Sequence, residues 1–211
     1  MGAPGSGKGS QCPAITERYD ICHLSTGDML REAIKNKTAN GMKAKDVMDQ
    51  GKLVSNEIVF DIVQDAMSSE KCKKGWVLDG LPRTLEQAQM MDKLNFGVQR
   101  VIGLEVPDQV IVKRVCGRWM HVPSGRIYHT EFKPPKIPGK DDITGDALTQ
   151  RSDDKKEIVE KRLKTFHEQT KPIYEYYREK RIFDLVDGNR SFQAVRDSIL
   201  GLLDKYYKPS K

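Results

Sequence analysis

The sequence predicts an α/β fold, a doubly wound parallel sheet, on the strength of three observations. Short apolar stretches alternate along the chain with longer segments of helical periodicity. A glycine-rich pattern typical of phosphate-binding loops, Gly2 to Ser10, leads directly into one of these helical segments. A second apolar stretch ends at Asp79, which would place a carboxylate at the ligand-binding edge of a parallel sheet. The 211 residues suffice for one domain with mobile insertions.

The predicted elements follow in chain order. Short buried strands are expected at residues 22–25, 76–78, 101–106 and 183–186. Helices are expected at 8–19, 27–37, 41–50, after an N-cap at Ser55, at 84–94, 109–116, from 155 onward, and at 191–207. Between about 117 and 154, prolines and glycines interrupt the helical pattern, which predicts a small β-rich flap.

Composition limits the classes of function. The net charge of +6 does not require a nucleic-acid partner, because small polyanionic substrates explain it equally well. No run of consecutive basic residues is long enough to form a nucleic-acid-binding stripe. No apolar stretch approaches the ~18 residues of a membrane span, and no signal-peptide pattern is present. The four cysteines form no C-x-x-C unit, so we expect reduced thiols in a cytoplasmic protein, with neither zinc nor disulfides.

The phosphate-loop pattern departs from its usual form in two ways. The position after Lys8 is Gly9 in place of the Ser or Thr that ligates Mg²⁺, and a hydroxyl follows one step later at Ser10. Only Met1 precedes the loop, whereas such loops normally follow a buried strand. Without that strand, neighbouring strands would carry unpaired backbone groups. Either the sequence is part of a longer protein, or the natural chain is shortened.

The segment from Asp79 to Arg83 is the second candidate element. Asp79 could hold Mg²⁺ through water or could cap the next helix. Gly80 would allow close backbone approach, and Arg83 could bind a phosphate at two points. Gln87 either completes a capping box begun by Thr84 or contacts substrate.

Together these motifs resemble the adenylate kinase family in its long-lid form, and are closest to the eukaryotic type 2 enzymes, with the first core strand missing. The matching stretches are 2–10, 24–31, 79–83, 117–118, 123–129, 133–135 and 151–154. The resemblance covers essentially the whole chain. Leu81 stands where these kinases usually carry Phe or Tyr, which predicts looser AMP packing.

The resemblance implies three regions: a core of residues 1–24, 55–116 and 155–211, an AMP-binding segment of 25–54, and a lid of 117–154. It implies reversible phosphoryl transfer from ATP to AMP, giving two ADP, with Mg²⁺ as cofactor and a monomeric enzyme. No nucleic acid or membrane partner is implied. Two alternatives stay open: a GTP:AMP phosphotransferase, and a truncated nucleotide-binding protein without activity.

The resemblance also assigns roles to residues. The catalytic set would be Lys8, Arg83, Arg118, Arg151, Arg162 and Asp79. The ATP side would use Gly5, Ser6, Gly7, Lys8, Gly9, Ser10, Arg114, Arg118, Ile127, Tyr128 and Arg190. The AMP side would use Thr26, Arg31, Lys52, Leu53, Val54, Gly80, Leu81, Pro82, Arg83, Gln87, Arg151 and Arg162. Asp153 and Asp154 would meet cationic groups when the lid closes. Independently of the resemblance, six cationic side chains would balance the roughly six negative charges of ATP plus AMP. They are Lys8, Arg31, Arg83, Arg118, Arg151 and Arg162.

A polar set in the lid has the spacing of a zinc site but not its chemistry. In some relatives, four thiols at this spacing bind zinc. Here the positions are His121, Ser124, Asp141 and Thr144, with no thiol and a single imidazole. We therefore expect a hydrogen-bonded cluster and no direct protein ligation of a metal.

Overall fold

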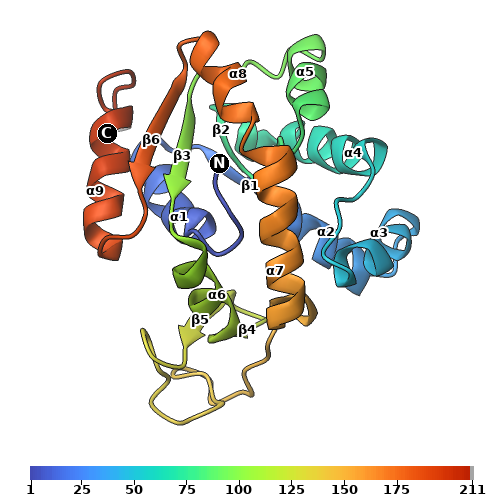
Figure 1. The fold of residues 1–211 in the computed structure, drawn as a ribbon, viewed down its shortest axis with the longest axis vertical. Helices are drawn as coiled ribbons and strands as arrows, with labels where there is room; N and C mark the ends of the chain where they lie inside the picture. The colour runs from blue at the N-terminus through green and yellow to red at the C-terminus, as the bar shows by residue number, and fades with distance from the viewer. Residues whose placement is uncertain (210–211) are drawn as a thin grey trace.

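The computed structural model describes residues 1–209 and has the predicted α/β class (Figure 1). Its helices are α1 Lys8–Tyr19, α2 Thr26–Lys35, α3 Ala39–Asp49, α4 Asn56–Met67, α5 Leu85–Lys93, α6 Asp108–Cys116, α7 Lys156–Thr165, α8 Ile173–Glu179 and α9 Phe192–Leu203. The core strands are β1 Cys22–Ser25, β2 Trp76–Asp79, β3 Val101–Glu105 and β6 Phe183–Asp187. The predicted helices and strands are all present, with boundaries shifted by a few residues.

The parallel sheet is divided into two pairs of strands. β1 pairs with β2, with Cys22 opposite Trp76, and β3 pairs with β6, with Val101 opposite Phe183. A cavity of about 770 Å³ is lined by residues of both β2 and β3. Figure 1 shows the amino terminus between these two strands, where the amide of Leu104 donates to the Met1 carbonyl at 2.9 Å. The gap lies where the sequence analysis expected unpaired strand edges.

Side-chain caps define several helix starts. Ser25 accepts the Asp28 amide at the start of α2, and Thr38 accepts the Gly41 amide at the start of α3. Ser55 occupies the predicted N-cap position of α4, yet its side chain makes no capping hydrogen bond. The entry of α4 is therefore fixed by packing of its buried face, which includes Phe60 and Val63.

Apolar helix faces cover the strands and one another. Ile111 and Val115 of α6 are buried against Val159 and Leu163 of α7. Burying one such side chain stabilises the fold by about 1.5–3 kcal/mol, so this contact fixes both helices firmly. Because α6 leads into the lid and α7 follows it, the lid rests on a rigid base (Figure 1).

The lid contains an antiparallel hairpin, as its composition predicted. Strand β4, Arg118–His121, pairs with β5, Arg126–His129, and Gly125 takes a positive φ in the turn between them. In Figure 1 this hairpin and the loop after it form the lower end of the molecule, on the far side of α6 from the strands.

The expectation of four reduced thiols is wrong for two of them. Cys22 and Cys72 form a disulfide, although 50 residues separate them in the sequence. Parallel pairing of β1 with β2 causes this proximity, since Cys72 ends a short 3-10 helix just before β2. A sequence pattern such as C-x-x-C cannot reveal two cysteines that come together only when the strands pair. Cys12 and Cys116 are free. Within residues 1–209, no helix has the length and apolarity required to cross a membrane.

Candidate active site

The phosphate loop closes on itself through Lys8. The Lys8 ammonium donates to the carbonyl oxygens of Gly2 at 2.7 Å and Ala3 at 2.8 Å. Gly5 has a positive φ, and a Cβ on it would lie 2.2 Å from a methyl of Val115, so only glycine fits. The helix α1 begins at Lys8 without a side-chain cap, so the backbone amides at its amino-terminal end are suited to an anion.

The segment after β2 places a second cation opposite this loop. Gly80 has a positive φ, and a Cβ there would lie 2.4 Å from the Thr26 hydroxyl. That tight contact lets Thr26 donate to the Asp79 carbonyl at 3.2 Å. The Arg83 Nε donates to the Gly80 carbonyl at 2.7 Å, which leaves its terminal nitrogens free to bind a ligand.

A single cleft of about 2180 Å³ brings the predicted residues together. Its lining includes every residue that the sequence analysis assigned to the catalytic set, the ATP side and the AMP side. Pockets for one small ligand typically occupy ~300–1,000 Å³, so this cleft has room for two nucleotides. The cations are therefore gathered in one place and not dispersed over the surface.

Burial, and after it the repulsion between neighbouring cations, lowers the pKa of several cationic groups in the cleft. Burial, together with the charge of Arg162, lowers the pKa of Arg83 to about 10. Burial and the charges of Arg31 and Arg118 lower the pKa of Arg151 to about 10. The pKa of Lys8 is lowered, mainly by burial. Such crowding is unfavourable unless negative charge enters the cleft, which favours a polyanionic ligand.

Carboxylates hold four of the arginines. Asp28 accepts from Arg31 at 2.6 Å and from Arg151 at 3.1 Å. The remaining two pairs join Arg118 to Asp154 at 2.5 Å and Arg162 to Asp153 at 2.9 Å. Lys8 and Arg83 differ: within residues 1–209, neither has a carboxylate at ion-pair distance.

Backbone carbonyls hold two arginines that were predicted for the ATP side. Arg114 donates to the Gly188 carbonyl at 3.1 Å, and Arg190 donates to the Asp187 carbonyl at 3.3 Å. The Tyr128 ring is almost fully buried, and its hydroxyl donates to Asp141, so it offers little surface to a base. Lys52, Leu53 and Val54 line the cleft from the loop between α3 and α4.

Gln87 has mostly structural partners. Two of its hydrogen bonds are ordinary contacts of a helix start. Its backbone N–H donates to the Thr84 hydroxyl at 3.2 Å, and its side-chain oxygen accepts the Arg83 amide at 2.7 Å. Its side-chain nitrogen donates to Asn56 at 2.9 Å. Gln87 thus fixes the backbone of Arg83, and its place in the AMP site stays a prediction.

The match to known proteins agrees with this geometry. The family model for adenylate kinase matches residues 1–182. The chain belongs to the adenylate kinase family. It is 44% identical over 203 residues to "Adenylate kinase 4" of Arabidopsis thaliana, covering 94% of this chain and 82% of that protein. It is 49% identical over 186 residues to "Adenylate kinase 4" of Oryza sativa subsp. japonica, covering 86% and 76%. "Adenylate kinase" of Photorhabdus laumondii is 44% identical over 209 residues, covering 97% and 98%.

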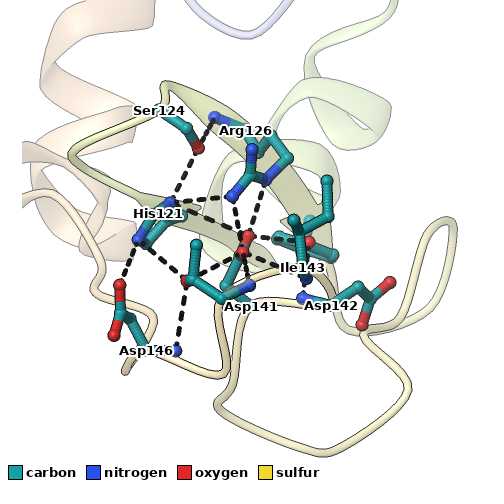
Figure 2. A network of polar contacts seen from close by, with 9 residues as sticks. His121, Ser124, Arg126, Asp141, Asp142, Ile143 and Asp146 are labelled. Carbon is teal, nitrogen blue, oxygen red and sulfur yellow. Dashed lines mark hydrogen bonds and ion pairs between the residues drawn. The ribbon is translucent and has the colours of Figure 1, made fainter.

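In this adenylate kinase family member, the lid cluster is hydrogen-bonded as predicted (Figure 2). Asp141 accepts from Arg126 at 2.6 Å and from the Thr144 hydroxyl at 3.1 Å. His121 contacts Ser124 through Nδ1 at 2.7 Å and Asp146 through Nε2 at 3.1 Å. The Arg126 guanidinium holds the pKa of Asp141 far below its usual range. The cluster folds the lid with ordinary side-chain contacts.

Sequence reasoning missed two residues that position the cleft. Asp28 bridges Arg31 and Arg151 across 123 residues of sequence. The i, i+3 spacing of Asp28 and Arg31 at the start of a predicted helix could have indicated the first of these contacts. Thr170 donates to the Arg83 carbonyl at 2.8 Å from a π-helical turn after α7, and no sequence pattern signals that contact.

Proposed function

We propose that this chain catalyses reversible transfer of a phosphoryl group from ATP to AMP, giving two ADP, with Mg²⁺. One observation carries the proposal: the half-buried Lys8 and Arg83 have no carboxylate partner among residues 1–209, and they line a cleft that has room for two nucleotides. Family membership supports the same activity. We further propose that one chain suffices as a monomer, because both halves of the cleft come from this chain.

The chain's own residues would do most of the work by positioning and charge. Backbone amides of the phosphate loop and Lys8 would hold the donor phosphates, while Arg83 and Arg31 would hold the acceptor phosphate. Arg118, Arg151 and Arg162 would neutralise the charge that spreads over the transferring group. The lid hairpin would exclude water, the competing acceptor.

Asp79 fits the proposed Mg²⁺ site. Its carboxylate makes no hydrogen bond or ion pair with residues 1–209, and it lies near the phosphate loop, with one oxygen 3.3 Å from the place a Cβ on Gly9 would take. Because Gly9 has no side chain, the space between the Asp79 carboxylate and the phosphate loop stays open. Asp79, and water between it and the ion, would hold Mg²⁺, which would neutralise phosphate charge when bound.

The test is direct. Purified protein is mixed with Mg²⁺ and ADP, and nucleotides are separated by anion-exchange chromatography. Equal amounts of ATP and AMP are expected, at a rate that a Lys8→Met protein purified in parallel does not reach. If the Lys8→Met protein were as active as the wild type, the activity would come from a contaminating enzyme. Tight binding of a bisubstrate dinucleotide without turnover would support the inactive alternative.

The donor base is tested in the reverse assay. AMP is supplied with either ATP or GTP, and ADP formation is followed for each. Faster turnover with ATP supports our proposal, and faster turnover with GTP would support the GTP:AMP alternative. The cytoplasmic location stays a prediction, to be tested by fractionating cells that express the chain.

A further inference from the structure

Three metal-ligating side chains meet beside the phosphate loop. Cys12 comes from α1, His23 from β1, and Asp79 from the end of β2. One ligand atom from each of the three lies within 4.8 Å of the other two. Within residues 1–209, no other group of three or more such side chains comes together in this way.

None of the three is committed to another strong partner. Cys12 is free and buried. The Nε2 atom of His23 is enclosed by protein and has no hydrogen-bond partner, an arrangement that costs free energy unless a ligand supplies the missing contact. The Asp79 carboxylate also lacks a partner among the residues described. The neighbouring Lys8 ammonium is held by the carbonyls of Gly2 and Ala3.

The donor set selects the class of metal. Mg²⁺ prefers oxygen ligands and keeps much of its water, so a thiol and an imidazole do not suit it. Sulfur, nitrogen and one carboxylate oxygen suit Zn²⁺, or Co²⁺ as its spectroscopic substitute. Ligand atoms around tetrahedral zinc are ~3.5 Å apart with bonds of ~2.0–2.3 Å. The three ligand atoms lie within 4.8 Å of one another, so they need to approach by no more than about 1.3 Å.

We propose that Cys12, His23 and Asp79 form a binding site for Zn²⁺, with the fourth tetrahedral position open to water or a phosphate oxygen. On binding, the Cys12 thiol gives its proton to solvent and the thiolate forms the metal–sulfur bond. Burial raises the pKa of this thiol to about 12, so a zinc ion that binds here must displace a firmly held proton. Binding is therefore weaker than at a structural zinc site.

Zinc at this place would inhibit the kinase. Asp79 is the carboxylate assigned above to Mg²⁺, and it cannot serve both ions in one geometry. This consequence, unlike the site itself, rests on the proposed function. Added Zn²⁺ should lower turnover in the presence of saturating Mg²⁺, and a zinc chelator should restore it.

The binding test does not use activity. Co²⁺ is titrated into the full chain, and the near-ultraviolet absorption that reports a cobalt–thiolate bond is followed. We expect one equivalent to give this band, and Zn²⁺ to abolish it. Cys12→Ser should remove the band, and His23→Gln should weaken Co²⁺ affinity at least about tenfold. Cys116→Ser, which removes the other free thiol, should leave the band unchanged.

The outcomes separate the two proposals. A wild-type protein without the thiolate band, or one whose band persists in Cys12→Ser, overturns the zinc site. Circular dichroism of each variant shows that it is folded. A zinc site that forms in a protein without phosphotransferase activity would leave this inference standing while the proposed function fails. Zinc inhibition that is unchanged in both Cys12→Ser and His23→Gln would place the inhibitory ion elsewhere.

Discussion

The guanidinium of Arg118 meets the carboxylate of Asp154 at two points, Nε to Oδ2 at 2.9 Å and Nη2 to Oδ1 at 2.5 Å. Arg118 begins the first lid strand and Asp154 ends the 3-10 helix Ser152–Asp154 at the end of the lid, so this pair joins the two ends of the lid. The Asp154 side chain is only 2% exposed, which makes the pair well shielded from water.

Removing that carboxylate should be costly. In Asp154→Ala, Arg118 and Arg162 lose a shared partner while both remain largely buried. Breaking a buried pair from one side typically costs ~3–5 kcal/mol, so we expect a drop of that order in the free energy of unfolding. Urea denaturation followed by circular dichroism measures it. Asp61→Ala on the exposed face of α4 is the matched control, with a change below about 0.5 kcal/mol expected.

Arg83 should be needed for turnover but not for folding. Arg83→Ala is expected to lose at least about a hundredfold in kcat, because the cleft then lacks an arginine whose terminal nitrogens are not paired with any carboxylate of residues 1–209. Arg83→Lys should recover only part of this loss, since an ammonium cannot bind a phosphate at two points. Steady-state kinetics and a thermal melt of each variant provide the measurement.

The surface pair Arg178–Glu175 supplies the control for that experiment. Arg178→Ala removes the same charge far from the cleft lining and should leave kcat within twofold of wild type. Near-normal turnover in Arg83→Ala would remove Arg83 from the site.

The lid cluster should give the fold a defined acid sensitivity. The pKa of Asp141 in the folded protein lies far below its unfolded value of ~3.9, chiefly because of Arg126. The stabilisation it contributes is therefore complete above about pH 4 and is lost as the pH falls toward the folded-state pKa. Asp141→Asn should melt at a lower temperature than wild type at neutral pH, and the difference should shrink below about pH 4. A difference that stays constant in calorimetry from pH 7 to pH 3 would contradict this.

The disulfide should contribute measurably to stability. Cys22 and Cys72 enclose a loop of 50 residues, for which the chain-entropy model gives about 4 kcal/mol. A reducing agent should therefore lower the melting temperature of the wild type. Cys72→Ser should melt at that lower temperature with or without reductant, and Cys116→Ser should behave as wild type in both conditions. Equal melting of the oxidised and reduced wild type would show that the bond does not hold the fold.

The gap between β2 and β3 should respond to added chain. An extension of about five apolar, β-branched residues before Met1 could pair with both strands and fill the cavity between them. The extended protein should then melt cooperatively at a higher temperature than the present chain, whereas an extension of equal length in Gly and Ser should not. Equal melting of the two extended proteins would show that pairing in the gap is dispensable.

The parts of this molecule that the sequence predicted are those with local causes. The helix after the phosphate loop, the strand that delivers Asp79 and the lid hairpin each follow from neighbouring residues, and each is present. The hydrogen-bonded lid cluster was predictable because its residue types favour hydrogen bonds over zinc ligation. Contacts made by tertiary proximity could not be predicted in this way. The Cys22–Cys72 bond depends on parallel strand pairing, and Arg151 reaches Asp28 from a segment 123 residues away.

The paired arginines change how salt should affect this protein. A cleft of bare cations would gather small anions from solution, and its ligands would compete with every buffer ion. Here four of the six positive groups already hold internal carboxylates, so an arriving nucleotide exchanges one anion for another. Recognition therefore depends on the number and spacing of phosphate oxygens more than on total charge, and chloride or inorganic phosphate at cellular concentrations should be a poor rival.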